Sequence, residues 1–400
     1  MSPSVLAVDP LLSGHVGLAV VLIVLLKVLL VFAFLLVATM LMIWFERKLI
    51  SDMQNRIGPN RAGPFGLLQT LADGIKSFFK EDLIPERSDR LVFKLAPFLS
   101  VVPAMLTFAV IPIGGNFANG NRGVVHIFGH DTYLQLADPP IGILLVLVMS
   151  SIAVYGIMLA GWSSGSKYPL LGSVRASAQM VSYEAALGLS VVAVVLVSGT
   201  LSTNGIVTSQ HTWHWNLWVT GVVPFIVFFI AGTAEVNRPP FDLVEAEQEL
   251  VGGFHTEYSG IRFAMFYLAE FMNAVTFAAV ITTLFLGGPN GPRLIGPGWL
   301  WGVIWFFLKL FVLLFTFVWV RATLPRFRYD QLMDLGWKTM IPLSLGWLLL
   351  LIAVRVGNDQ GWNLPLVLVI SMAVLVAAYG LMVLAFRTAA RNRLESEVSA

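Results

Sequence analysis

Residues 14–45 read GHVGLAVVLIVLLKVLLVFAFLLVATMLMIWF, an apolar run in which Lys27 is the only formally charged side chain. A helix that crosses the hydrocarbon core of a bilayer needs about 20 such residues. The run is longer than that, and no Lys or Arg precedes Lys27. It therefore predicts a retained, tilted transmembrane helix rather than a signal peptide, which would begin with basic residues.

The whole chain has the composition of a membrane protein. Of its 400 residues, 57% are hydrophobic and 12% are charged, and its mean hydropathy is +0.80. Soluble domains carry about 25% charged residues. The chain contains no cysteine, which excludes Cys-ligated iron–sulfur clusters, thiol chemistry and disulfides within it. It also has no HExxH, GxGxxG or Walker sequence, so neither a metal site nor a nucleotide site is predicted.

Nine segments are candidate membrane spans. They cover residues 14–45, 94–114, 140–161, 178–199, 217–235, 262–287, 299–321, 339–355 and 363–386. The first is long, the eighth is short, and no separate soluble domain is visible. We therefore expect an all-α polytopic membrane protein, with residues 1–400 forming a single transmembrane domain of about nine transmembrane helices.

The distribution of Lys and Arg sets the expected orientation. With the N-terminus outside, 20 of these residues fall in the inner loops and the tail, and three, Arg122, Arg293 and Arg355, fall outside. Cytoplasmic loops carry the excess of positive charge. The N-terminus is therefore expected outside and the C-terminus in the cytoplasm.

The longest of the expected cytoplasmic loops contains an amphipathic pattern. Residues 64–80 read PFGLLQTLADGIKSFFK, and their apolar residues recur at helical spacing while Gln69, Asp73, Lys76 and Lys80 share the other face. Pro64 suits the first turn of a helix. The pattern predicts an amphipathic helix lying at the inner membrane interface.

Acidic residues are concentrated in one segment. Residues 231–260 read AGTAEVNRPPFDLVEAEQELVGGFHTEYSG and hold six carboxylates but one firm cation, Arg238. Glu245 and Glu249 are four residues apart, which on a helix would place two like charges on one face. A compensating cation or a shared proton is therefore expected beside them.

Further acids lie inside the spans themselves. Counted at 1.5 Å per residue, Glu184 and Glu270 lie roughly 12–13 Å beyond the inner starts of spans four and six. Glu46 and Glu235 end spans one and five on the same side, whereas the outer half offers only Asp138. Ionisable residues within spans usually mark a pathway, and crowded carboxylates share protons. The pattern predicts a polar funnel that opens inward and stops near the midplane.

Proline-rich breaks follow two of the spans on the inner side. RPPF, residues 238–241, and RIGPNRAGP, residues 56–64, force extended backbone near the membrane. Irregular backbone at that depth is tolerated where it lines a cavity. The breaks predict a chamber between the inner loops that suits an amphiphilic ligand. Those loops are residues 46–93, 162–177 and 236–261.

Simpler interpretations stay open for several of these residues. The loop acids 245–249 could be solvated or could face a basic partner, and the two intramembrane acids could be structural ion pairs. Asp73 could form only a surface pair with Lys76, and Lys27 could extend its ammonium towards the interface. Lys309 lies near mid-span, so we expect it to pair with a buried acid.

Five stretches together resemble the H subunit of NADH-quinone oxidoreductase, respiratory complex I, which is subunit 1 in mitochondria. The likeness runs from about residue 25 to about residue 350, and these motifs are long and specific. The stretches are ERKLISDMQNRIGPNRAGPFGLLQTLADGIKSFFKE (46–81), GWSSGSKYPLLGSVRASAQMVSYE (161–184), AEVNRPPFDLVEAEQELVGGFHTEY (234–258), FYLAEF (266–271) and RATLPRFRYDQLM (321–333).

The resemblance implies a function and partners. Members of this family form a quinone chamber with peripheral-arm subunits and couple quinone reduction to proton translocation. Quinone would be bound as the substrate at that subunit interface, and the chain would hold no iron–sulfur cluster or flavin and would not be catalytic alone. The implied partners are the peripheral-arm quinone-site and iron–sulfur subunits, small membrane subunits, antiporter-like subunits and membrane lipid, but no nucleic acid. The implied location is the bacterial plasma membrane or an equivalent energy-transducing membrane.

The resemblance also implies roles for individual residues. The implied proton path comprises Glu184, Glu235, Glu245, Glu247, Glu249, Glu257 and Glu270. The implied quinone chamber comprises Arg47, Arg56, Asp73, Lys76, Phe241 and Asp242. The supporting ion-pair positions are Glu46, Arg238, Lys309, Arg321, Arg326 and Asp330. One departure is Phe271, where the family often has a tyrosine beside the acid of the sixth span. Residues 363–400 extend past many members.

Other functions remain possible at this stage. The chain could be the homologous membrane subunit of a membrane-bound hydrogenase-type complex, although the completeness of the loop motifs favours the first assignment. A stand-alone secondary transporter should show inverted repeats and a midplane site reachable from both sides, and neither is visible. A passive anchor for soluble partners would explain a charged inner surface, but not Glu184 or Glu270.

Overall fold

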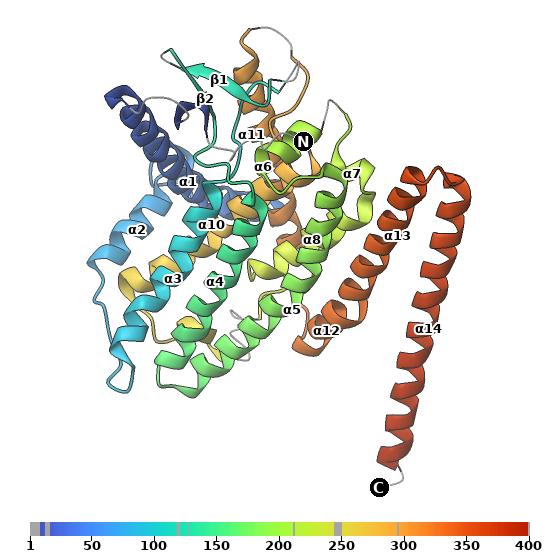
Figure 1. Ribbon diagram of the computed structural model, residues 1–400. Helices are drawn as coiled ribbons and strands as arrows, with labels where there is room; N and C mark the ends of the chain where they lie inside the picture. The colour runs from blue at the N-terminus through green and yellow to red at the C-terminus, as the bar shows by residue number, and fades with distance from the viewer. Residues whose placement is uncertain are drawn as a thin grey trace.

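The computed structural model describes residues 9–12, 17–117, 121–127, 129–210, 213–243, 250–293 and 296–398. Long helices dominate these residues and pack side by side (Figure 1), which confirms the expected all-α polytopic fold. The helices are α1 Leu18–Met53, α2 Gln69–Phe79, α3 Arg90–Phe108, α4 Gly142–Ser163, α5 Lys167–Ser198, α6 Thr203–Ser209, α7 Asn216–Val219, α8 Val222–Glu235, α10 Gly260–Phe285, α11 Gly298–Thr323, α12 Tyr329–Asp334, α13 Ile341–Asp359 and α14 Leu364–Val398. The short elements are η1 Pro10–Leu12, η2 Pro64–Gly66, η4 Gly253–His255 and the π-helical turn η5 Leu335–Met340, with strands β1 Val124–Ile127 and β2 His130–Tyr133.

Within the described ranges, eight helices are long and apolar enough to cross a membrane, and α8 is a ninth, shorter apolar helix. Two boundaries differ clearly from the predicted spans. Helix α5 begins at Lys167, whereas the predicted span begins at residue 178. The first turns of α5 carry polar residues, so an apolar pattern does not detect them. Helices α12 and α13 join through η5 into one continuous helical segment, Tyr329–Asp359, where the sequence suggested only a short span.

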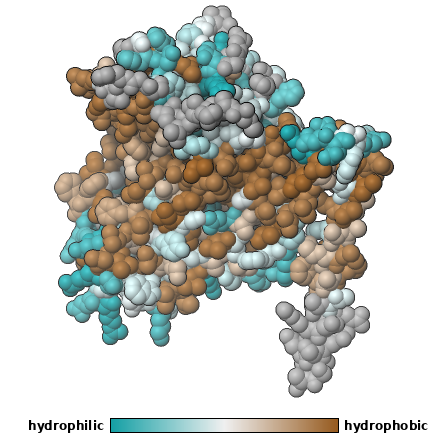
Figure 2. All heavy atoms as spheres, viewed as in Figure 1, coloured by the Kyte–Doolittle hydropathy of each residue, from teal (hydrophilic) through white to brown (hydrophobic). Residues whose placement is uncertain are grey.

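Helix α10 forms the centre of the bundle. Two thirds of its apolar window (67%) is buried, against none of that of α14. It packs on α3, α1 and α11, while α3, α4, α5 and α8 form a row of neighbouring helices. Figure 2 shows apolar side chains forming a broad band across the face in view, with more polar side chains above and below it. The single acid of α10, Glu270, is therefore carried by the central helix of the bundle.

The two ends of the bundle differ in structure. At the hairpin end, β1 and β2 pair antiparallel in the register Val124↔Tyr133 to Ile127↔His130, near α6 and α7 (Figure 1). At the opposite end, which we call the η4 end, α5 begins and packs against η4. The sequence analysis predicted no strand where the hairpin lies. Its stabilising contacts come from distant residues, which local sequence does not reveal.

Lys27 does not extend towards the membrane interface as the simpler interpretation suggested. Its ammonium lies 2.6 Å from Asp9 Oδ2 and donates to Thr132 Oγ1 at 3.0 Å. Thr132 in turn donates to Asp9. An ion pair thus ties η1 and the hairpin to α1, because both segments fold back over the helix.

The amphipathic helix is shorter than the sequence predicted. Residues 64–68 form η2 and a turn, and α2 begins only at Gln69. The backbone has positive φ at Gly63, just before η2, and at Phe65 and Gly66 within it. A Cβ on Gly66 would meet the backbone of Pro59, so this tight turn requires glycine. None of the α2 residues is buried, and Leu71 and Ile75 are about half exposed. The apolar face of α2 is therefore available to lipid or to a partner.

The C-terminal extension lies beside the bundle rather than in it. Helix α14 packs on α13 and stands apart from the other helices (Figure 1). One further contact places the Lys338 ammonium 5.6 Å from the centre of the Phe386 ring.

Close packing of α3 against α4 depends on Gly156. A Cβ there would lie 2.9 Å from the backbone nitrogen of Ser100. We expect Gly156→Ala to lower stability by about 1–3 kcal/mol through overpacking. Gly188→Ala is the matched control, because a Cβ at Gly188 on α5 would meet nothing within 4 Å. Thermal unfolding of the purified assembly would compare the two, and equal midpoints would show that the α3–α4 contact does not need glycine.

Candidate functional site

The loop after α8 directs one arginine into the bundle. Helix α8 ends at Glu235, as the RPPF sequence suggested, and Asn237 has a positive φ. The Arg238 nitrogen donates to Thr233 O at 3.4 Å, and the Phe241 nitrogen donates to Arg238 O at 2.9 Å. The turn leaves the Arg238 side chain only 6% exposed. A buried guanidinium needs compensating carboxylates.

Two carboxylates from different helices face Arg238. Its Nη1 donates to Glu46 Oε2, and its Nε lies 3.1 Å from Glu270 Oε1. Arg321 on α11 donates to the other oxygen of Glu46. We call Glu46, Arg238, Glu270 and Arg321 the arginine cluster. It joins α1, the loop after α8 and α11 by charge-assisted hydrogen bonds to Glu46, and it joins α10 by the ion pair with Glu270.

Two aromatic side chains, Phe271 and Tyr267, lie beside the arginine cluster. The guanidinium of Arg238 lies 3.8 Å from the centre of the Phe271 ring. The sequence showed that a tyrosine hydroxyl common in the family is missing here, but Tyr267 lies one helical turn away with its ring 4.8 Å from that of Phe271. Tyr267 also interacts with Arg47. The cluster therefore has a phenol beside it, although not at the expected position.

A second pair of acids meets at α4. Ser150 Oγ donates to Glu235 Oε1 at 2.5 Å, and Ser151 Oγ donates to Glu184. Because the two serines are neighbours on α4, they hold the acids of α8 and α5 next to each other. Glu235 is 3% exposed, and its Oε2 is buried without a hydrogen-bond partner among the described residues. We call Glu184 and Glu235 the serine-bound pair.

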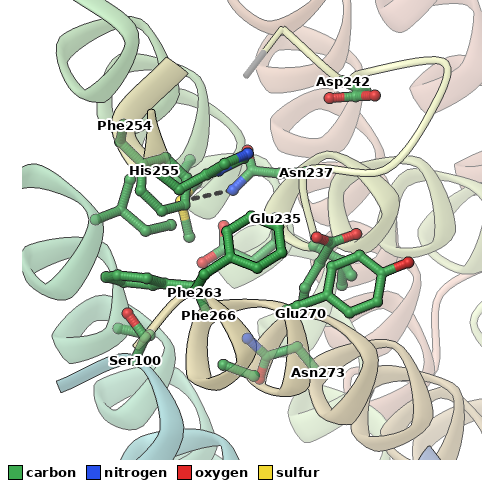
Figure 3. A pocket seen from close by; sticks show the side chains of 16 residues that line it. Ser100, Glu235, Asn237, Asp242, Phe254, His255, Phe263, Phe266, Glu270 and Asn273 are labelled. Atoms are coloured by element: carbon green, nitrogen blue, oxygen red, sulfur yellow. Dashed lines mark hydrogen bonds between the residues drawn. The ribbon is translucent and has the colours of Figure 1, made fainter. Parts of the chain in front are cut away.

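A cavity connects the two groups of acids. It measures about 50 Å³, and its wall includes Glu235 and Glu270 together with Asn237, Asn273 and His255 (Figure 3). One water needs roughly 10–15 Å³ of such space, so three or four waters fit. Phe254, Phe263 and Phe266 form part of the apolar wall. The cavity can therefore hold a short water chain between carboxylates of the arginine cluster and of the serine-bound pair.

A second, smaller void continues from the first. It measures about 10 Å³ and shares Glu235 and Asn273 with the larger cavity. Ser150, Thr107 and Phe277 also line it, so it reaches α3. It has room for about one water. Glu235 and Asn273 thus lie between two polar spaces.

The predicted chamber residues lie in two places. Arg47 Nη1 is 2.7 Å from Asp73 Oδ2, and both side chains are 41% exposed. This pair bridges α1 and α2, and it replaces the Asp73–Lys76 surface pair that the sequence allowed. Arg56 and Lys76 are exposed in the same region. The segment between α1 and α3 therefore presents charged side chains beside the apolar face of α2.

Asp242 and Phe241 lie deeper. Asp242 is 2% exposed, and its Oδ2 lies 3.1 Å from Arg326 Nη2. Arg326 therefore forms an ion pair with Asp242. Phe241 is buried, with its ring centre 5.5 Å from that of Tyr183 and 5.4 Å from that of Phe327. Phe241 therefore packs inside the protein beside the loop after α8, and its place in the quinone chamber stays a prediction.

Two predicted ion pairs are not observed. Lys309 is buried, but its ammonium donates to the carbonyls of Leu286, Gly288 and Asn290 at 2.7–2.9 Å and has no carboxylate partner among the described residues. Lys309 belongs to α11, and its ammonium lies beside the last residues of α10. Glu270 lies in the first half of α10, too far along the helix to form an ion pair with Lys309. Asp330 is exposed in the first turn of α12, and no ion pair involves it within the described ranges.

The remaining acids fall in two groups. Glu257 is half-buried just after η4. Glu245, Glu247 and Glu249 lie outside the described residues. Sequence reasoning missed Ser150, Ser151, Asn237, Asn273 and His255, which bind or surround the acids. The adjacent serines in the otherwise apolar run VLVMSSIAV could have indicated polar partners inside α4.

Comparison with known proteins gives consistent matches. A family model described as NADH dehydrogenase matches residues 26–352. Three relatives are each named as the H subunit of NADH-quinone oxidoreductase. That of Frankia alni is 52% identical over 381 residues, which cover 92% of this chain and 82% of the relative. That of Frankia casuarinae is 54% identical over 339 residues, 83% of this chain and 73% of the relative. That of Streptomyces avermitilis is 49% identical over 346 residues, which cover 85% of this chain and 75% of the relative.

The arginine cluster should be sensitive to loss of one charge. Glu46→Gln removes the carboxylate shared by Arg238 and Arg321, and a buried charge left without its partner costs about 3 kcal/mol or more. We expect a much lower thermal midpoint and less assembled protein. Asp334→Asn is the control, because the Asp334–Lys338 pair is about half exposed and is worth well under about 1 kcal/mol. Equal effects of the two substitutions would contradict a stabilising role for the cluster.

Proposed function

Because the chain belongs to the family of the NADH-quinone oxidoreductase H subunit, we propose that it couples quinone reduction to proton translocation through its buried carboxylates. As a member it is a membrane subunit of an oxidoreductase complex whose other subunits are its partners. The finer assignment is ours: its inner loops form the quinone chamber with peripheral-arm subunits, and its acids carry the proton signal. The single observation that supports this most strongly is the cavity shared by Glu235 and Glu270.

Proton transfer needs carboxylates joined by water or hydroxyl groups. The cavity has room for a few waters between Glu235 and Glu270, and the adjacent hydroxyls of Ser150 and Ser151 bind Glu235 and Glu184 respectively. Acids this close do not titrate independently, so a proton gained by one changes the affinity of the next. We propose that Glu184, Glu235 and Glu270, with Glu257 and the loop acids Glu245, Glu247 and Glu249 nearer the chamber, act as one coupled path.

The quinone would reach the path from the η4 end. The pairs Arg47–Asp73 and Asp242–Arg326 supply charged groups for a polar head, and the exposed apolar face of α2 suits a lipid-soluble tail. The electrons come from an iron–sulfur partner, because this chain has no cysteine to bind such a cluster. We propose that the loops 46–93, 162–177 and 236–261 form the membrane-side wall of the chamber.

The path does not continue straight across the bundle in this proposal. On α10, Glu270, Asn273 and Thr276 follow one another at helical spacing, but residues 277–281 are buried and apolar. The void that shares Glu235 instead leads towards Thr107 on α3. The proton signal would therefore leave sideways, to antiporter-like neighbours in the bacterial plasma membrane. In this assignment the η4 end faces the cytoplasm, with the N-terminus outside.

Glu235→Gln tests the proposal in the whole complex reconstituted into vesicles. The amide keeps the size and the acceptor for Ser150 but cannot carry the proton, so we expect NADH-driven proton pumping to fall roughly tenfold or more. Asp359→Asn is the control, because Asp359 is an exposed acid at the end of α13, outside the three loops of the proposed chamber.

Assembly of the complex is checked on native gels for both variants. Wild-type pumping and quinone reduction in an assembled Glu235→Gln complex would show that the buried carboxylate does not take part in coupling.

A further inference from the structure

The cavity wall contains one imidazole, that of His255 in η4. Imidazole is the only side chain whose ordinary pKa falls between about pH 5 and 8. The other titratable groups that face the cavity are Glu235, Asp242, Glu270 and Tyr267, while Tyr258 and Arg262 lie behind η4. A histidine in this position can exchange protons at physiological pH.

The backbone of His255 is held in place by its neighbours. Gly172 on α5 lies so close to η4 that a Cβ there would be 2.7 Å from the Cα of Gly253. The His255 carbonyl accepts from the Tyr258 nitrogen at 3.0 Å. The Tyr258 hydroxyl in turn donates to Phe93 O at 3.1 Å, a carbonyl that Pro97 in α3 leaves without its helical donor. Burial raises the pKa of Tyr258 to about 12, so it remains a donor at neutral pH.

The imidazole ring is oriented by two aromatic rings. Its centre lies 5.0 Å from that of Phe254 at an interplanar angle of 89°, and 5.4 Å from that of Phe263 at 68°. Both phenylalanines also line the cavity, and Figure 3 shows His255 next to Phe254, with Phe263 below them. Edge-to-face packing favours one plane for a ring. The orientation of the imidazole towards the cavity is therefore set in part by apolar contacts.

The position of His255 bridges two environments. Its side chain is half-buried, so it touches both the surface at the η4 end and the cavity, whereas Glu235 is 3% exposed. A proton that reaches Glu235 from that surface must pass the cavity. His255 is the group on the wall best placed to take it up first.

We propose that His255 is the proton-exchange residue of the cavity, feeding the carboxylates that the proposed function uses. In one transfer an N–H bond of imidazolium breaks, the proton passes to a cavity water, and that water gives up another proton to a carboxylate oxygen of Glu235. The imidazole is left neutral and takes a new proton from the medium. No electron moves in these steps. His255 acts on the coupled protonation of Glu235 and Glu270 and does not need to touch quinone.

Substitutions at His255 test this in the reconstituted whole complex. His255→Gln keeps a polar side chain but does not titrate, so we expect proton-coupled turnover to fall roughly tenfold near neutral pH. Its pH profile should also lose the rise and fall that a group titrating near neutrality produces. His126→Gln is the matched control, because the His126 side chain is 68% exposed in the hairpin, where it faces Asp131. That variant should keep the wild-type rate and profile.

Chemical rescue separates proton exchange from packing. In His255→Gly, imidazole added to the medium should restore turnover, whereas pyrazole, a ring of the same size that is not basic near neutrality, should not. Restoration by both rings would overturn the proposal in favour of a packing role. A wild-type pH profile in assembled His255→Gln, or in His255→Asn where Gln disturbs assembly, would also overturn it.

The same experiment distinguishes this inference from the proposed function on which it rests. If Glu235→Gln abolishes pumping while His255→Gln leaves it intact, only the role of His255 fails. If Glu235→Gln pumps normally, the coupled path itself fails.

Discussion

The charge of Arg238, buried in the middle of the protein, is the constraint on which the site depends. A guanidinium removed from water must be matched by carboxylates, and here it receives them from α1 and α10, with Arg321 on α11 sharing Glu46. The loop after α8 therefore cannot move independently of these helices. Asn237 and Asp242 belong to this loop, and Glu235 ends the helix before it. The arginine cluster thus fixes the position of the acids that line the cavity.

The buried acids of the site differ in how strongly their carboxylates are paired. Glu46 is matched by two arginines, whereas Glu235 receives only a serine hydroxyl on one oxygen and none among the described residues on the other. A carboxylate locked between cations holds its charge. A carboxylate with only a hydroxyl and room for water can change protonation at lower cost. In the proposed function, Glu46 is therefore a structural acid and Glu235 is the acid suited to coupling.

The fold could largely be anticipated from the sequence because membrane spans are set by local composition. The apolar runs predicted the helices, and the RPPF sequence correctly marked the end of α8. The start of α5 and the hairpin were missed, since both depend on contacts with distant residues. The site was anticipated unevenly for the same reason. The depth of Glu184 and Glu270 follows from helical rise, but the two serines on α4 and the position of Tyr267 depend on how helices face one another. Lys309 illustrates this limit: its depth suggested a carboxylate partner, but the carbonyls that end α10 surround it instead.

The central claim is that Glu235 changes protonation when the quinone of the complex is reduced. Infrared difference spectra of the whole complex, recorded between its oxidised and reduced states, report this directly through the carbonyl stretch of protonated carboxyl groups. The account predicts a band in that region that disappears in Glu235→Gln and persists in Asp359→Asn. A difference spectrum of assembled Glu235→Gln identical to that of the wild type would contradict it.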